Sequence, residues 1–233
     1  MDLKKPILFS SLFILFTIIG TISHEYGHII VAKFLGYGTE LHYGSMNYDN
    51  DFKNNEIHNI INRNKTQAVN HQSFPEEQKL NRLIKKNRRD SLLISIGGPL
   101  QTIITGTLGF LILLYRKEKI KRNGLKIFDW LCVFLSLFWL RQVSNLLLYF
   151  IKVFILKKQK HFNGDEYHIA LMLRIPSETI SLITGIVGLL ISLVVIFKII
   201  DDKNRSAFIV SGLVGGIIGF IFWMRIVGPI ILP

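Results

Sequence analysis

The sequence is nearly without cysteine and, over long stretches, without charge. Cys132 is the only cysteine among 233 residues, which excludes a disulfide within the chain. A lone cysteine in an apolar run is most often a small buried hydrophobe. Aspartate, glutamate, lysine and arginine are all missing from residues 6–22, 91–115, 179–197 and 206–224. A further apolar run, residues 127–156, has as its charged residues only Asp129, Arg141 and Lys152.

These apolar runs have the length of membrane spans. About 20 apolar residues in a helix cross a hydrocarbon core of roughly 30 Å. The backbone must satisfy its own hydrogen bonds there, so each run is predicted to be a helix. No cleavage site of small residues follows the first run, so we expect it to be retained as a span. The sequence therefore predicts an all-α, multi-pass integral membrane protein with about five transmembrane helices in a single domain, residues 1–233.

Recognised nucleic-acid-binding motifs are also missing, although the formal net charge is +12. Basic loops beside membrane spans meet anionic lipid head groups, which explains the charge without a nucleic-acid partner. We therefore expect a lipid bilayer around the protein and no nucleic acid bound to it.

Residues 36–90, between the first two runs, are predicted to form a polar, basic loop. Within it, residues 39–46 mix Tyr, Thr and Leu with polar residues, a pattern typical of one or two short strands. Residues 47–72 are rich in asparagine and charge, and we expect them to be an exposed loop. Residues 73–90 favour a helix with Leu and Ile on one face, which either lies on the bilayer surface or is solvated.

The first apolar run leads into His24, Glu25 and His28, which form an HExxH motif. Helical residues four apart lie on one face with Cβ atoms roughly 5–6 Å apart, so two imidazoles can bind one Zn²⁺. The glutamate is placed to take a proton from water and pass it to a leaving amine. Ionisable groups at membrane depth are costly, which favours a functional role. Because catalytic zinc usually has three protein ligands and an open position, we expect a third ligand elsewhere.

Simple hairpin connections would gather three polar segments at one side of the membrane. If the first three spans alternate in direction, the end of the first, the start of the second and the end of the third lie on the same side. These places hold His24 to His28, Gly97-Gly98-Pro99 and Asn163-Gly164-Asp165-Glu166. We expect Gly98 to lie at the thinnest wall near the metal, where a substrate segment would approach laterally.

The motifs HEYGH, GGPLQT and NLLLYF…NGDE, in this order, resemble the intramembrane zinc metalloproteases of the site-2-protease family. The resemblance covers the whole membrane core. It implies that Asp165 is the third zinc ligand, with Glu166 as an alternative because glycine here precedes the aspartate and does not follow it. It also implies that Asn145 orients the substrate or stabilises the oxyanion.

Two arginines, Arg141 and Arg225, lie in apolar runs. One of them is a candidate to neutralise an acidic ligand or a developing oxyanion, and snorkelling or structural pairing is the alternative.

The favoured function is an intramembrane zinc endopeptidase, which hydrolyses a peptide bond in or next to a transmembrane segment of a membrane protein. The alternative is a non-catalytic, zinc-containing membrane binding or scaffold protein. Glu25 argues against that alternative, because a structural zinc site needs ligands but no general base. A metal transporter is disfavoured, because its polar groups would extend through the membrane depth and here they gather at one side.

Overall fold

The structure, a computed structural model, describes residues 4–70, 72–151, 153 and 164–233. Within these residues, five helical segments are long and apolar enough to cross a membrane, which confirms the predicted all-α fold. The segments are α1 (Lys4–Phe34); α4 (Glu77–Asn123); α5 (Ile127–Ser136) with η1 (Leu137–Trp139) and α6 (Leu140–Phe150); α8 (Thr179–Val194) with η3 (Val195–Ile199); and α9 (Asp202–Ile221) with η4 (Phe222–Val227) and α10 (Gly228–Ile231). Residues 152 and 154–156 of the predicted third span lie outside the described residues.

A short β-hairpin follows α1 and confirms the predicted strand-like segment. Its strands are β1 (Thr39–Leu41) and β2 (Met46–Tyr48), which pair antiparallel. The register pairs Thr39 with Tyr48, Glu40 with Asn47 and Leu41 with Met46.

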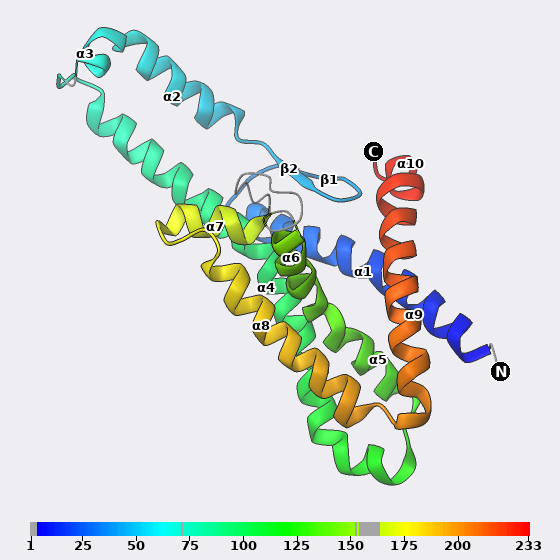
Figure 1. The fold of residues 1–233 in the computed structure, drawn as a ribbon. Helices are drawn as coiled ribbons and strands as arrows, with labels where there is room; N and C mark the ends of the chain where they lie inside the picture. The colour runs from blue at the N-terminus through cyan, green and yellow to red at the C-terminus, as the bar shows by residue number, and fades with distance from the viewer. Residues whose placement is uncertain (1–3, 71, 152, 154–163) are drawn as a thin grey trace.

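The tip of the hairpin contacts the last membrane segment. Trp223 Nε1 donates a hydrogen bond of 2.6 Å to the carbonyl oxygen of Tyr43. The backbone N–H of Tyr43 donates to the carbonyl oxygen of Leu232 at 2.9 Å. The hairpin therefore links the end of α1 to the region of α10, as Figure 1 shows.

Within the predicted loop at residues 36–90, the exposed loop expected at residues 47–72 is wrong, whereas the helix expected at residues 73–90 is present from Glu77 onward. Most of the asparagine-rich part forms α2 (Asp51–Arg63) and α3 (Lys65–Val69). Helix α4 begins at Glu77 and continues into the second span as one helix of 47 residues. The helix predicted for residues 73–90 is therefore the first part of α4 and not a separate element. No glycine or proline stands between Glu77 and Gly97 to interrupt it.

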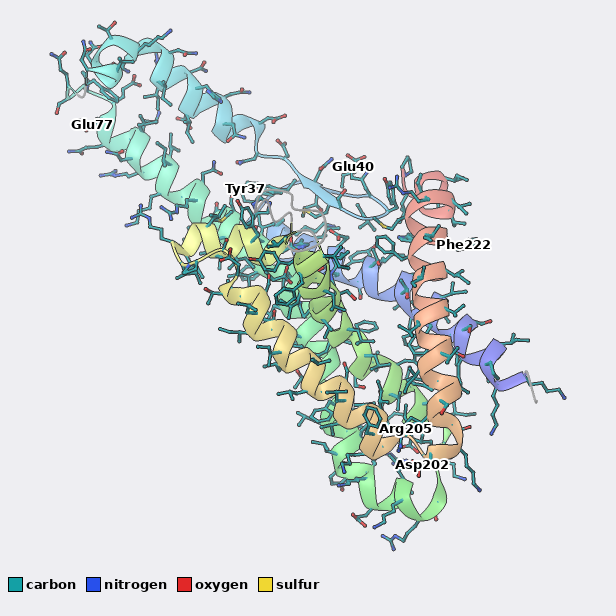
Figure 2. All side chains as sticks on the ribbon, in the orientation of Figure 1. Tyr37, Glu40, Glu77, Asp202, Arg205 and Phe222 are labelled. Carbon is teal, nitrogen blue, oxygen red and sulfur yellow. The ribbon has the colours of Figure 1, made fainter. Side chains whose placement is uncertain are left out.

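Helix α2 folds because the start of α4 gives it a partner. Ile60 of α2 is fully buried and Leu80 of α4 is nearly so. A polar contact also joins the two helices, since the Nζ of Lys79 lies 2.7 Å from a carboxylate oxygen of Glu56. The two helices lie side by side and extend away from the membrane segments in Figure 1, with Glu77 near the far end in Figure 2.

The first half of α1 packs into an aromatic cluster with α5 and α9. The ring of Phe13 lies 5.1 Å from that of Phe134 and 4.9 Å from that of Phe208. The ring centroids of Phe9 and Trp130 lie 4.9 Å apart. Aromatic pairs at such distances contribute roughly 0.5–1.5 kcal/mol each beyond their buried area. This cluster anchors the first half of α1, and the HExxH motif follows in the second half of the same helix.

The second half of α1 instead lies against α4 at a very close backbone crossing. A Cβ atom placed on Gly27 would lie 2.5 Å from the carbonyl oxygen of Gly97, and one placed on Gly97 would lie 2.5 Å from that of Gly27. Only glycine at both positions permits this approach. The crossing brings α4 against the face of α1 that carries the motif histidines.

Candidate metal centre

Three potential metal donors converge at the end of α1. His24 and His28 lie one turn apart on α1, and Asp165 is the first residue of α7 (Asp165–Leu173). The Nε2 atoms of His24 and His28 lie 2.9 Å and 3.4 Å from Asp165 Oδ2. The two Nε2 atoms lie 3.2 Å from each other. These three atoms form a group that could hold one metal ion.

The spacing and chemistry of the donors fit Zn²⁺. Nitrogen and oxygen ligands at about 2.0–2.2 Å from a tetrahedral zinc lie roughly 3.3 Å from one another. The observed separations of 2.9, 3.2 and 3.4 Å are close to that value. Two imidazoles and one carboxylate also leave a fourth position open, as catalytic zinc requires.

The ring of His24 is oriented by Thr102 of α4. His24 Nδ1 lies 2.9 Å from Thr102 Oγ1, and both residues are buried. The Thr102 hydroxyl donates to the carbonyl oxygen of Gly98 at 3.1 Å, so its oxygen is left to accept the Nδ1–H of His24. This tautomer leaves the Nε2 lone pair of His24 for a metal.

The ring of His28 is oriented by the backbone of α4. His28 Nδ1 lies 2.6 Å from the carbonyl oxygen of Ile94. A carbonyl oxygen only accepts, and this contact is much shorter than the 3.3 Å between Nδ1 and the backbone N of Gly98, so Nδ1 carries the proton and the lone pair of Nε2 faces Asp165. Both imidazoles thus present Nε2 to the same point, and α4 supplies both of the groups that orient them.

Gly98 lies directly against the two donor nitrogens. A Cβ atom at this position would lie 2.2 Å from Nε2 of His28 and 2.6 Å from Nε2 of His24. The space beside the histidines therefore exists because residue 98 has no side chain. Gly98 therefore lies near the metal donors as predicted, and a bulkier residue there would displace the two histidines.

The structure places Asp165, and not Glu166, beside the histidine pair. Glu166 is 1% exposed and faces Asn145 of α6, whose Nδ2 lies 3.3 Å and 3.2 Å from its two carboxylate oxygens. Asn145 was predicted to contact substrate or an oxyanion. Its amide donates to Glu166, so its position supports the start of α7 and thereby Asp165.

The two neighbouring carboxyl groups have opposite electrostatic environments. Burial alone would raise the pKa of Asp165, but when the imidazoles of His24 and His28 are protonated, their hydrogen bonds and charges outweigh burial and hold this pKa well below its ordinary value. Burial raises the pKa of Glu166, and the charge of Asp165 adds to the increase. Asp165 is therefore the one held as a carboxylate, the form that binds a metal.

Glu25 is buried beside this donor group and faces an arginine from α6. The side chain of Glu25 is 7% exposed, and its Oε1 lies 4.0 Å from Nη2 of Arg141. That separation is longer than a hydrogen bond, but the two charges still attract each other. Arg141 and Asn145 are one helical turn apart, so the same face of α6 contacts Glu25 and Glu166.

The sequence did not indicate Thr102 or the carbonyl group of Ile94 as parts of the centre. A threonine four residues after Gly98 lies on the same helix face, and this spacing was the available signal. A backbone carbonyl group has no sequence signal, because every residue carries one. Both contacts depend on how closely α1 and α4 cross.

Comparisons of the chain with protein-family models, with curated protein sequences and with solved structures find no match.

Proposed function

We propose that the protein is an intramembrane zinc endopeptidase that cuts a peptide bond in or beside a transmembrane segment of a membrane protein. The observation that carries this proposal is the convergence of His24, His28 and Asp165 with the buried carboxyl group of Glu25 next to them. A zinc site with a structural role alone has no need of Glu25. The resemblance of the HEYGH, GGPLQT and NGDE segments to site-2 proteases supports the same proposal.

Each residue of the centre has a separate task in peptide hydrolysis. Zinc, when bound by the three donors, supplies Lewis acidity toward water and toward the substrate carbonyl group. Glu25 accepts a proton from the attacking water as the new C–O bond forms. It then delivers that proton to the amine nitrogen as the C–N bond breaks. Thr102 and the carbonyl group of Ile94 keep the histidine rings in place throughout.

The depth of the centre favours a membrane substrate. Glu25 lies 21 residues after the first residue of α1, which corresponds to about 30 Å along the helix axis. The motif thus lies near one side of a hydrocarbon core, among helices that a folded soluble protein cannot enter. A single membrane segment with a locally unwound backbone can reach it, because a helical backbone keeps its carbonyl groups occupied.

The direct test is the substitution Glu25→Gln in the purified protein. Because it deletes the base and keeps the ligands, it should retain one zinc per chain and lower cleavage by roughly 100- to 10,000-fold. Cleavage is measured by mass spectrometry on single-span peptides in liposomes, with casein as the soluble comparison substrate. Glu118→Gln, at an exposed position near the other end of α4, is the matched control and should cleave normally.

Three results would count against the proposal. Undiminished cleavage by Glu25→Gln would assign the base to another residue. Efficient cleavage of casein with the membrane peptides intact would exclude an intramembrane substrate. Stoichiometric zinc without cleavage of any peptide would favour the non-catalytic membrane scaffold.

A further inference from the structure

We propose that Arg141 binds the carbonyl oxygen of the scissile peptide bond and stabilises the negative charge that develops on it. This inference rests on the proposed endopeptidase function and adds a substrate-binding residue to it. It starts from the position of a cationic side chain in a membrane helix, which is costly unless the charge has a use.

The guanidinium group of Arg141 is near Glu25 but does not bind it directly. Nη2 of Arg141 lies 4.0 Å from Glu25 Oε1, beyond hydrogen-bond distance. Nε of Arg141 is buried and has no hydrogen-bond partner in the described part of the chain. A buried N–H without an acceptor costs roughly 1–3 kcal/mol. The guanidinium group therefore carries an unused donor next to the proposed general base.

The backbone of α6 holds Arg141 firmly at this place. Residues on both sides of Arg141 pack against glycines of α8. A Cβ at Gly188 would lie 2.7 Å from the carbonyl oxygen of Trp139, and a Cβ at Gly185 would lie 2.7 Å from the side chain of Leu146. An oxyanion donor is effective when its position is set before the reaction begins, and this packing fixes the backbone from which the Arg141 side chain extends.

A purely structural role explains the contacts of Arg141 less well. A snorkelling arginine keeps its whole head group in water, but Nε of Arg141 is buried and one third of its side chain is exposed. A pairing arginine would approach Glu25 closely enough for a hydrogen bond. Arg225, the other arginine in an apolar run, is exposed on η4 and so provides a matched control.

The chemistry requires such a donor at the carbonyl oxygen. When water attacks the carbonyl carbon, the electron pair of the C=O double bond moves to oxygen, and Glu25 takes the proton that the water loses. As the C–N bond breaks, that pair returns and the amine leaves with the proton from Glu25. A guanidinium hydrogen bond is stronger to the anionic oxygen than to the neutral carbonyl group, so it lowers the barrier.

A phosphinic pseudopeptide with leucine on both sides of the phosphorus tests the proposal, because its tetrahedral anionic group imitates the attacked carbonyl group. Its affinity is measured by isothermal titration calorimetry on zinc-loaded protein in detergent. We expect Arg141→Gln to weaken binding about 100-fold, the effect of losing one oxyanion donor. The affinity of Arg141→Lys should lie between those of wild type and Arg141→Gln. Arg225→Gln should bind the pseudopeptide as tightly as wild type.

The same comparison is repeated in a Glu25→Gln background. The negative charge of Glu25 is already removed there, so a loss of affinity that persists cannot be transmitted through Glu25. We expect the same loss of affinity in both backgrounds. A loss confined to the background with Glu25 would make Arg141 a positioning residue for the base and overturn the proposal.

The remaining outcomes are also decisive. Equal affinity of wild type and Arg141→Gln, or no binding by any variant, would overturn the assignment of Arg141. Loss of zinc from both Arg141→Gln and Arg141→Lys would show that Arg141 supports the metal centre itself. This result would also overturn the assignment of Arg141 as the oxyanion donor. If binding of the pseudopeptide depends on Arg141 but wild type cleaves no peptide, the anion-binding role of Arg141 is supported. That result would contradict only the proposed peptidase function.

Discussion

The two halves of α1 are parts of one helix but are held in different ways. The first half packs through Phe9 and Phe13 against aromatic rings of α5 and α9. The second half, with His24 and His28, packs through Gly27 on the backbone of α4 and through directed polar contacts. Apolar packing of the first kind tolerates change if volume is kept, whereas hydrogen-bonded donors at fixed distances do not. Substitutions in the second half should therefore affect the metal centre most.

The largest effect is expected for the motif histidines. His24→Ala or His28→Ala removes one of three donors and should abolish stoichiometric zinc binding. Zinc content per chain is measured by inductively coupled plasma mass spectrometry on purified protein. The double variant with one zinc still bound would show that the metal lies elsewhere.

A nearly equal effect is expected for Gly98→Ala. The added Cβ would meet the Nε2 atoms of both histidines, so we expect zinc affinity to fall roughly 100-fold, as overpacking at a rigid site costs about 1–3 kcal/mol. Competition with a chromophoric chelator measures the affinity. Gly216→Ala is the matched control, because nothing lies within 4 Å of its added Cβ. Normal zinc affinity in Gly98→Ala would contradict the tight fit of α4 beneath the histidines.

A smaller effect is expected for Thr102→Val, which keeps the shape of the side chain and removes the hydroxyl group at His24. Loss of a group that orients a metal ligand typically costs 10- to 100-fold in metal affinity. Chelator competition again provides the measurement. Thr184→Val is the control, since that hydroxyl donates to the carbonyl oxygen of Ile180 in its own helix. Equal affinities in the two variants would exclude Thr102 as the residue that orients His24.

The smallest effect on the centre is expected for Phe13→Leu in the other half of α1. It removes aromatic contacts with Phe134 and Phe208 and should lower the free energy of unfolding by about 1–2 kcal/mol. Thermal unfolding in detergent gives the stability, and zinc affinity should stay at the wild-type value. A loss of zinc as large as that of Thr102→Val would show that the two halves are not separable.

The spans and the HExxH residues were predictable because their signals are local. An uncharged run such as residues 179–197 has few alternatives to a membrane helix, and His24 and His28 share a helix face whatever surrounds them. The loop predicted for residues 47–72 failed for the opposite reason. Helix α2 is polar along most of its length and is stabilised by α4, with Ile60 and Leu80 buried and Glu56 paired with Lys79.

The sequence by itself determined the five membrane helices, the short strand-like segment and the histidine pair with Glu25, because each depends on residues close together in the chain. The tertiary structure alone decided that Asp165 and not Glu166 joins the histidines, that Thr102 lies beside His24 and that Arg141 lies near Glu25. Asp165 is 141 residues away from His24 in the chain, so its contact with that histidine depends on how the helices pack. The close crossing at Gly27 and Gly97 brings α4 to the face of α1 that carries the histidines, and a crossing of this kind has no local sequence signal.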